Sequence, residues 1–390
     1  MDLITSVLIL LSASLIIGEL LEVKGFPAVV GALLVGLILG PAVFNILQPN
    51  AVLHGLSEIA LFFIVLLIGV DVTSDLLTKY SGKGWVLTIS SFVIPLITMV
   101  AIADFVFQVG LTESIAVSIG IGVPSISIIS VLVNRYSLLR SSSGNHILAS
   151  VVITDIMAFI LLSATIDPQR VVEKMIGIAI LIVIILLLDR IIKRHSTEIV
   201  NFFVKLHTTE RGEEIIFGLI IIWGLLVSAI LDIIGISYVL GALFSGLIVS
   251  EVIVGKELIG IIRRTLNRLN ESFFIPIFFT IAGLDATIPG SSYFPLLVSL
   301  VAISAIVGGV LTYFSSKTLM KDINPRTTMA ILGGRGAVGI IIAAVAFQDG
   351  VIDSTLYSLV ILGSIILSLI MPVLADRRDM MGKPDKTLDY

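Results

Sequence analysis

A single carboxylate, Asp155, lies in the middle of the apolar stretch Ile147–Ile166, which reads ILASVVITDIMAFILLSATI. A charged side chain at the centre of a bilayer costs at least about 2.5 kcal/mol, so an acidic residue at that depth marks a functional site by default. Such a carboxylate can hold either a proton or a cation, and a neutralised site crosses an apolar barrier far more cheaply than a charged one. Competition at Asp155 would therefore couple the movement of a proton to that of a cation.

Hard cations prefer oxygen ligands. Close to Asp155, the Thr154 hydroxyl can supply one. A second group of oxygens lies earlier in the chain, at 123–130 (VPSISIIS). We expect the Ser125 and Ser127 hydroxyls and the main chain near Val123 to face the same cation. The chain has no cysteine, so thiolate metal sites are excluded. Within the apolar stretches we find no Ser/His, His/Glu or Asp/Asp pair at catalytic spacing, so we expect neither an enzyme nor a cofactor.

The elements that must position these groups are membrane spans. The chain has 390 residues, of which 57% are hydrophobic and only 13% are charged. Soluble domains carry about 25% charged residues, and a helix needs about 20 apolar residues to cross a bilayer. We predict thirteen such spans, at 3–23, 27–47, 54–70, 85–109, 113–133, 146–166, 171–189, 214–234, 237–254, 273–288, 293–316, 326–348 and 355–375. The chain is therefore predicted to be an all-α multi-pass membrane protein.

Basic residues lie almost entirely on one side of these spans. Of the 24 Lys and Arg residues, 21 fall in the connections after odd-numbered spans or in the C-terminal tail, and Arg170 and Lys174 lie opposite. The positive-inside rule places the crowded side in the cytoplasm. We therefore expect a cell-membrane protein with its N-terminus outside and its C-terminus inside. Basic and aromatic residues do not cluster in a soluble module, so we expect no nucleic-acid partner.

Two pairs of segments repeat at nearly the same offset. GALLVGLILG at Gly31–Gly40 is similar to GALFSGLIVS at Gly241–Ser250, 210 residues later. LLIGVD ending at Asp71 is similar to TIAGLD ending at Asp285, 214 residues later. The matched spans are seven apart, so the two copies cross the membrane in opposite directions. Such an inverted repeat is a common architecture of secondary transporters.

Both repeats contain a position that should interrupt a helix. Pro124 lies in the fifth span, and adding 210 leads to the GGRG sequence of the twelfth span, formed by Gly333, Gly334, Arg335 and Gly336. Proline removes a backbone donor and glycine weakens a helix. We predict two crossed discontinuous helices, whose freed carbonyls could coordinate a cation beside Asp155.

With these motifs in place, the chain resembles the monovalent cation/proton antiporter superfamily along spans 1–13. The resemblance rests on five segments: Gly31–Pro41, Leu56–Asp71, VITD at Val152–Asp155, FFIPIFFTIAGLD at Phe273–Asp285 and GGRGAVG at Gly333–Gly339. It implies an exchanger of Na⁺, or Li⁺, for H⁺ that acts in pH homeostasis, with Asp155 as the shared site. It also implies a homodimer, embedded in lipid, formed by about spans 1–3 and 8–10.

The chain departs from the family pattern at three positions. Thr154 stands where the paired ion-site motif has Asp or Asn. The helix 296–316 has no basic residue, and Ser304 or Ala305 falls where members with two aspartates carry a lysine. Ser150 stands where other members carry a glutamate that pairs with the arginine of the second break. The resemblance implies an electroneutral type with one carboxylate, while the partner of Arg335 stays open.

We expect Arg335 to hold the crossed breaks together by neutralising helix ends. Glu58 is either a second carboxylate near the site or an interfacial charge. The resemblance divides the chain into scaffold helices at 1–84, core helices at 85–167, a linker at 168–212, scaffold helices at 213–291, core helices at 292–375 and a cytoplasmic tail at 376–390. Between 256 and 272, alternating basic and apolar residues predict a cytoplasmic interfacial helix.

Other functions stay possible at this point. A K⁺/H⁺ exchanger would use the same residues, because spacing does not determine cavity size. An organic-anion symporter on a related fold would favour more basic residues near the breaks, where only Arg335 is present. A membrane sensor or an intramembrane enzyme has little support from the residues inside the spans.

Overall fold

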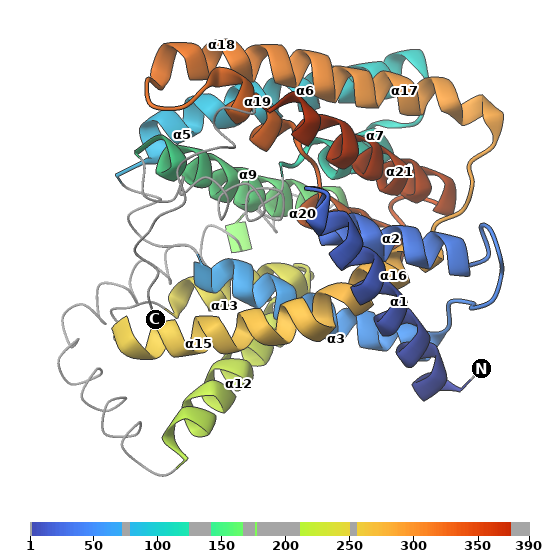
Figure 1. Ribbon diagram of the computed structural model, residues 1–390, viewed down its shortest axis with the longest axis vertical. Coiled ribbons are helices and arrows are strands. Elements are labelled where there is room, and N and C mark those ends of the chain that lie inside the picture. Colours follow the sequence, from blue (N-terminus) through green and yellow to red (C-terminus); the bar gives the residue numbers. More distant parts are fainter. Residues whose placement is uncertain are drawn as a thin grey trace. The chain divides into compact units, whose positions relative to one another are not determined.

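The computed structural model describes residues 2–71, 79–124, 142–166, 176–177, 211–249 and 256–375. Every regular element in these ranges is helical, and the extended backbone contributes one isolated bridge, between Pro124 and Arg335 (Figure 1). Seven of the described helical stretches are long and apolar enough to cross a membrane. The predicted all-α multi-pass architecture is confirmed.

Each predicted span except the seventh coincides with a helix or with a broken helix. The long stretches are α1 (Leu3–Val23), α3 (Ala51–Asp71), Ser81–Val106, α9 (Ser142–Ile166), α12 (Gly212–Ile233), Ser291–Leu319 and Ser354–Leu374. The shorter apolar helices are α2 (Ala28–Leu39), α7 (Leu111–Gly122), α13 (Tyr238–Ile248) and α20 (Ala337–Gln348). The seventh span, at 171–189, lies outside the described residues apart from 176–177.

Several predicted boundaries need correction. The second span is shorter than predicted, because α2 ends before Gly40 and Pro41. The predicted interfacial helix at 256–272 is not a separate element. It runs as α15 (Lys256–Leu269) through a π-helical segment, η5 (Asn270–Phe274), into α16 (Ile275–Asp285) without a break. A π-helical segment keeps a helix continuous while changing its register. The helix that begins at Lys256 therefore leads directly into the predicted tenth span.

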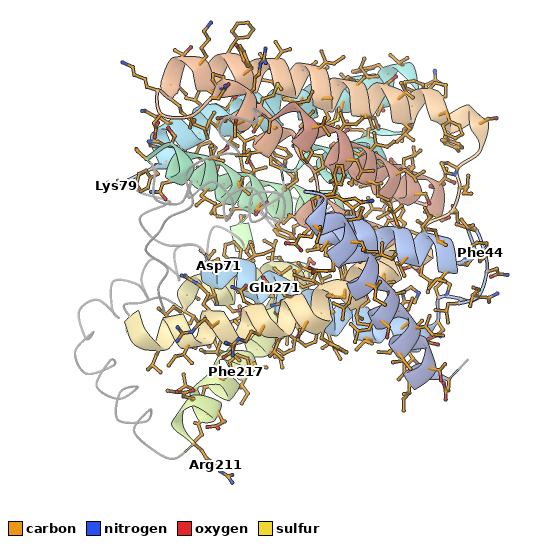
Figure 2. All side chains as sticks on the ribbon, viewed as in Figure 1. Phe44, Asp71, Lys79, Arg211, Phe217 and Glu271 are labelled. Atoms are coloured by element: carbon orange, nitrogen blue, oxygen red, sulfur yellow. The ribbon has the colours of Figure 1, made fainter. Side chains whose placement is uncertain are left out.

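The described residues form two compact units. The first comprises those within Met1–Pro49, Asp75–Leu162 and Phe279–Tyr390, and the second those within Asn50–Ser74 and Ser163–Phe278. These two units reflect how the helices pack, whereas the predicted scaffold and core are groups of helices that would move against each other. The division into scaffold and core therefore stays a prediction. In the second unit, Arg263 of α15 lies 2.8 Å from the carboxylate of Asp71 (labelled in Figure 2) and donates to the Val70 carbonyl, which caps the end of α3.

The predicted repeat appears as one glycine-lined helix crossing in each unit. In the first unit α2 crosses α16, and a Cβ atom on Gly36 would lie 1.9 Å from the Thr280 carbonyl oxygen. In the second unit α13 crosses α3, and a Cβ atom on Gly246 would lie 2.4 Å from the Leu66 carbonyl oxygen. Gly36 and Gly246 are 210 residues apart, which is the offset of the sequence repeat. Small residues that let backbones touch are the usual way in which membrane helices associate.

We expect Gly36→Ala to lower the melting temperature of the detergent-solubilised protein, because the added methyl group would overlap the backbone of α16. Overpacking of this kind costs about 1–3 kcal/mol. Gly55→Ala is the matched control, since no atom lies within 4 Å of its Cβ position. The melting temperatures would be measured by intrinsic tryptophan fluorescence. Equal values for the two variants would show that the crossing is looser than described.

Candidate functional site

Two helices end at the positions where the sequence predicts an interruption. The first, α7, ends at Gly122, and Val123 continues in an extended conformation with φ −71° and ψ 122°. The second helix has its first half in α19 (Pro325–Gly333) and its second half in α20; Gly334 between them is extended, with φ −69° and ψ 135°. The extended segments meet in an antiparallel bridge between Pro124 and Arg335. The second predicted discontinuous helix is therefore present, and the first predicted helix ends at its expected break; its continuation after Pro124 lies outside the described residues.

Two of the helical segments beside the breaks, α7 and α20, also touch directly. A Cβ atom on Gly339 of α20 would lie 2.1 Å from the Gly120 carbonyl oxygen of α7, so only glycine permits this approach. Val123 donates its N–H to the Ile119 carbonyl and Gly334 donates to the Ala330 carbonyl, which closes the last turn before each break. The carbonyls beyond those turns lack intrahelical partners.

Asp155 lies near the middle of the 25-residue helix α9 and is 1% exposed. Neither of its carboxylate oxygens has a hydrogen-bond partner among the residues that the structure describes. One turn earlier, Val151 packs in an apolar cluster with Ile331 and Leu332, which immediately precede the second break. Since a helix rises about 1.5 Å per residue, Asp155 lies close to the depth of the break.

Neutral hydrogen bonds hold this part of α9 in place. The Thr154 hydroxyl donates to the Ser150 carbonyl at 2.8 Å, which leaves its oxygen lone pairs free. Thr88 of α5 (Ser81–Thr88) lies with its hydroxyl oxygen 3.0 Å from the same carbonyl and 3.1 Å from the Ser150 hydroxyl. Thr88 was not predicted from the sequence, because membrane helices commonly use threonine in packing and its hydroxyl gives no signal by itself.

Arg335 is 1% exposed and forms no ion pair within the described part of the chain. Its guanidinium donates to three oxygens: the Ser304 hydroxyl at 3.0 Å from Nε, the Leu332 carbonyl at 3.2 Å and the Ser91 carbonyl at 3.4 Å. The Ser368 hydroxyl donates to the main-chain carbonyl of Arg335. Of these residues, Ser304 was expected only from the family resemblance, and Ser91 and Ser368 were not predicted.

The other predicted site residues have different positions. Val123 and Pro124 lie at the first break, and Gly333, Gly334 and Gly336 lie at the second. Glu58 is exposed on α3 in the second unit. Ser125 and Ser127 lie outside the described residues.

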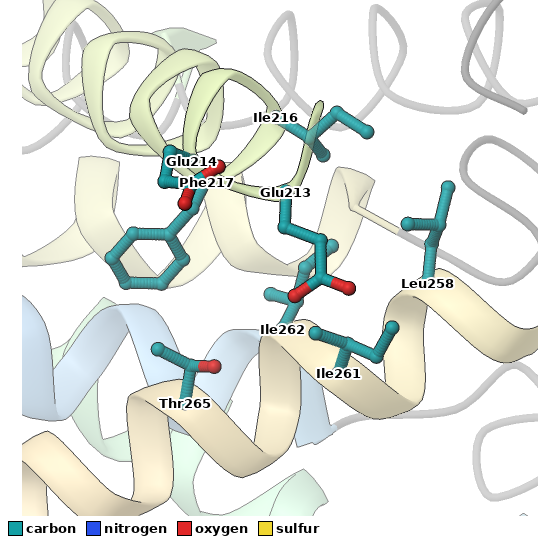
Figure 3. A pocket seen from close by; sticks show the side chains of 8 residues that line it. All are labelled: Glu213, Glu214, Ile216, Phe217, Leu258, Ile261, Ile262 and Thr265. Carbon is teal, nitrogen blue, oxygen red and sulfur yellow. The ribbon is translucent and has the colours of Figure 1, made fainter. Parts of the chain in front are cut away.

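A hollow in the second unit contains none of these residues. It lies between the first turn of α12 and one face of α15, and Figure 3 shows two glutamates, Glu213 and Glu214, among the residues that line it. The remaining lining residues are mostly apolar: Ile216, Phe217, Leu258, Ile261, Ile262 and Thr265. In the part of the chain that is described, no group of three or more His, Cys, Asp or Glu residues could hold a metal ion.

The N-terminal end of α9 is fastened to two connections of the first unit. The Asp322 carboxylate accepts hydrogen bonds from the main-chain N–H and the hydroxyl of Ser143. His146 lies with Nδ1 2.9 Å from the Tyr80 carbonyl oxygen, so this nitrogen must carry the proton. The hydrogen bond from Ser143, supported by the charge of Lys83, lowers the pKa of Asp322.

The family model described as "Sodium/hydrogen exchanger, transmembrane" matches residues 7–376. The chain belongs to the sodium/hydrogen exchanger family. A Na⁺/H⁺ antiporter of Enterococcus hirae is 27% identical over 369 residues, which cover 90% of this exchanger and 91% of the relative. A probable Na⁺/H⁺ antiporter 3 of Methanocaldococcus jannaschii is 24% identical, with 94% of each chain covered.

Another relative carries a different cation in its name. The K⁺/H⁺ antiporter 1 of Saccharomyces cerevisiae is 22% identical and covers 88% of this exchanger, which in turn spans 42% of that longer protein. Among solved structures, the sodium proton antiporter MjNhaP1 of Methanocaldococcus jannaschii at pH 8 has a TM-score of 0.68 and 16% identity, covering 97% of the exchanger and 96% of that chain. This match shows that the fold is shared.

We expect Asp322→Ala to destabilise the exchanger at neutral pH by about 1 kcal/mol, the usual loss when a helix N-cap is replaced by alanine, because it removes the acceptor of the Ser143 N–H at the start of α9. Because folding lowers the pKa of Asp322, its contribution is present above the unfolded pKa of 3.8 and is lost as the pH falls through the lower folded value. The melting temperatures of wild type and variant should therefore differ at pH 7 and converge at the acid end of a series from pH 7 to pH 3.

Ser143→Ala removes the hydroxyl donor of the same contact but keeps the main-chain N–H, and it is the matched variant. The double variant should be no less stable than the variant at Asp322 alone, since that change already removes the acceptor that the Ser143 hydroxyl uses. Additive losses in the double variant would show that Asp322 stabilises the protein through a different partner.

Proposed function

We propose that this protein exchanges Na⁺, or Li⁺, for H⁺ across the membrane by competition at Asp155. The observation that carries the proposal is a buried carboxylate, near the depth of two crossed helix breaks, with both oxygens unpartnered in the described part of the chain. A structural carboxylate at this depth would be expected to accept hydrogen bonds, because an unpaired buried charge is costly. A proton or a cation is the natural missing partner.

One carboxylate is sufficient for coupling. Among the acidic side chains that the structure describes, only that of Asp155 is buried. When a proton and a monovalent cation take turns at one carboxylate, each exchange moves one positive charge in each direction. The proposed exchange is therefore electroneutral, and no second carboxylate is needed.

The predicted ligand oxygens suit an alkali cation. The carboxylate of Asp155, the free lone pairs of Thr154 and the main chain at Val123 are hard oxygen donors. The hydroxyls of Ser125 and Ser127 remain predicted ligands. We favour Na⁺ because the Enterococcus hirae and Methanocaldococcus jannaschii relatives are named Na⁺/H⁺ antiporters; the yeast relative makes K⁺ the alternative to test.

Access to the site is proposed to alternate between the two sides of the membrane. In this scheme the core helices at 85–167 and 292–375 move against the scaffold helices at 1–84 and 213–291. The proposed assembly is a homodimer in the cell membrane, with the N-terminus outside and the C-terminus in the cytoplasm. Large apolar side chains exposed along α1, among them Ile4, Leu8 and Ile16, suit contact with lipid or with a second copy.

Asp155→Asn should abolish cation-driven proton release in proteoliposomes, because an amide can neither ionise nor give up a proton in exchange for a cation. The assay would follow a pH-sensitive dye after separate additions of Na⁺, Li⁺ and K⁺. The variant should keep its melting temperature, since Asp155 makes no hydrogen bond in the described structure. Asp104→Asn, which changes a partly exposed aspartate in η2 (Ile102–Val106), is the matched control. Retained exchange by Asp155→Asn would overturn the proposal.

The rate of Na⁺/H⁺ exchange should not depend on membrane potential. Moving one net charge through 100 mV is worth about 2.3 kcal/mol, so an electrogenic exchanger would respond strongly. Potentials of either sign would be imposed with valinomycin and K⁺ gradients at a fixed Na⁺ gradient. An unequal response to the two signs would replace one-for-one exchange by an unequal stoichiometry.

A further inference from the structure

Within the first unit, side chains of α21 (Ser354–Ile370) cap the C-terminal end of α16. The Tyr357 hydroxyl donates to the Ala282 carbonyl at 2.9 Å. Ala282 lies in the last turn of α16, and the Ala286 N–H, four residues on, donates to the Gly283 carbonyl instead. The Tyr357 hydroxyl therefore satisfies a helix-end carbonyl that its own helix leaves without a partner.

A second contact lies just beyond the end of α16. The Thr287 N–H donates to the Ser358 hydroxyl at 2.8 Å, and the two hydroxyl oxygens are 3.2 Å apart. The Ser358 hydroxyl itself donates to the Ser354 carbonyl of its own helix at 2.6 Å. Together, Tyr357, Ser358, Ala282 and Thr287 form what we call the α16–α21 latch. All of its hydrogen bonds join neutral groups.

The helices on each side of the latch are packed closely against other partners. On one side, a Cβ atom on Gly283 of α16 would lie 2.2 Å from the Leu33 carbonyl oxygen of α2, so these two backbones touch. On the other side, the Tyr357 ring of α21 stacks on Phe347 of α20, with ring centroids 4.8 Å apart. The latch thus joins the pair α2 and α16 to the pair α20 and α21, of which α20 begins at the second break.

Acidic residues place the latch at an edge of the membrane. Asp285 is the last residue of α16, and Asp353, which is exposed, caps the start of α21. Charged side chains at the bilayer centre are costly, so helix ends that carry them belong at the interface. There, water can replace a hydrogen bond to a helix-end group, which it cannot do in the hydrocarbon interior. The contacts of the latch can therefore break and re-form at small cost.

We propose that the α16–α21 latch closes the outer side of the exchanger and sets the balance between its inward-open and outward-open states. This inference rests on the proposed function, in which the scaffold helices at 213–291 and the core helices at 292–375 move against each other. The latch joins a helix of the first group to a helix of the second, at the end that faces outside in the proposed orientation. Opening would separate Tyr357 from Ala282 and Ser358 from Thr287, while the packing of α16 on α2 and of α21 on α20 stays intact.

The first test measures how fast an external reagent reaches the latch. The chain has no cysteine, so Ala286→Cys places a single thiol beside the latch, at a residue that is 1% exposed. Tyr357→Phe keeps the aromatic ring and removes only the hydrogen bond. In right-side-out membrane vesicles it should raise the rate at which a membrane-impermeant maleimide labels this thiol about fivefold, the change in an opening equilibrium that follows from losing one neutral hydrogen bond. Ser358→Ala should act in the same direction.

Two further variants are the controls. Ile288→Cys, at a residue that is 64% exposed, should be labelled from outside whether or not the latch is intact. Tyr313→Phe changes a tyrosine of α18 (Gly309–Leu319) whose ring packs edge-on against Phe314, away from the latch, and should leave the labelling rate unchanged. Unchanged labelling in both Tyr357→Phe and Ser358→Ala would overturn the latch, even if the melting temperature falls. Labelling of Ile288→Cys only from the inner side would overturn its assignment to the outer side.

The second test locks the latch. Thr287→Cys combined with Ser358→Cys places two thiols where the native hydroxyl oxygens are 3.2 Å apart, and copper phenanthroline would oxidise them to a disulfide. Na⁺/H⁺ exchange in proteoliposomes should be lost on oxidation and should return with dithiothreitol, whereas each single variant should be insensitive to the oxidant. Retained exchange by fully cross-linked protein would overturn the latch alone. Wild-type protein that exchanges no alkali cation for protons would instead overturn the proposed function, because labelling does not require transport.

Discussion

Backbone polar groups inside a membrane must find partners within the protein, because the lipid offers none. That constraint explains the centre of the first unit. Each interrupted helix frees groups that only the other break or a nearby side chain can satisfy, and the bridge between Pro124 and Arg335 does so at their crossing. Arg335 adds a bond to Leu332 through its guanidinium and accepts one from Ser368 at its carbonyl. The breaks can exist because each supports the other.

The inverted repeat supplies symmetric architecture, whereas its charges are asymmetric. Corresponding breaks, π-helical segments and glycine crossings occur in both halves. The residue 210 positions before Arg335 is Ser125, so the first half has no matching arginine. The residue 210 positions after Asp155 is Ile365, so the second half has no matching aspartate. Among the described residues of the first unit, one charge of each sign is buried, on Asp155 and on Arg335, and the two are not ion-paired. An ion pair would occupy the carboxylate that the proposed exchange requires.

Rigid support and an open carboxylate are combined in α9. Apolar packing of Val151 and the hydrogen bonds around Ser150 hold the helix one turn below Asp155, and Asp322 caps its start. All of these contacts use neighbours of the carboxylate rather than the carboxylate itself. A ligand at Asp155 would therefore meet a preorganised position, which lowers the cost of ordering the site on binding.

The sequence by itself determined the class of fold, most span positions, the repeat and both breaks. These features follow from local chemistry: apolar length sets a span, proline and glycine interrupt a helix, and recurring motifs reveal a duplication. Only the tertiary structure decided which oxygens receive the guanidinium of Arg335, that Thr88 supports Ser150, and that α15 continues into α16. Such pairings join residues up to 244 positions apart. They depend on helix packing and on π-helical segments, for which single serine and threonine residues carry no distinguishing pattern.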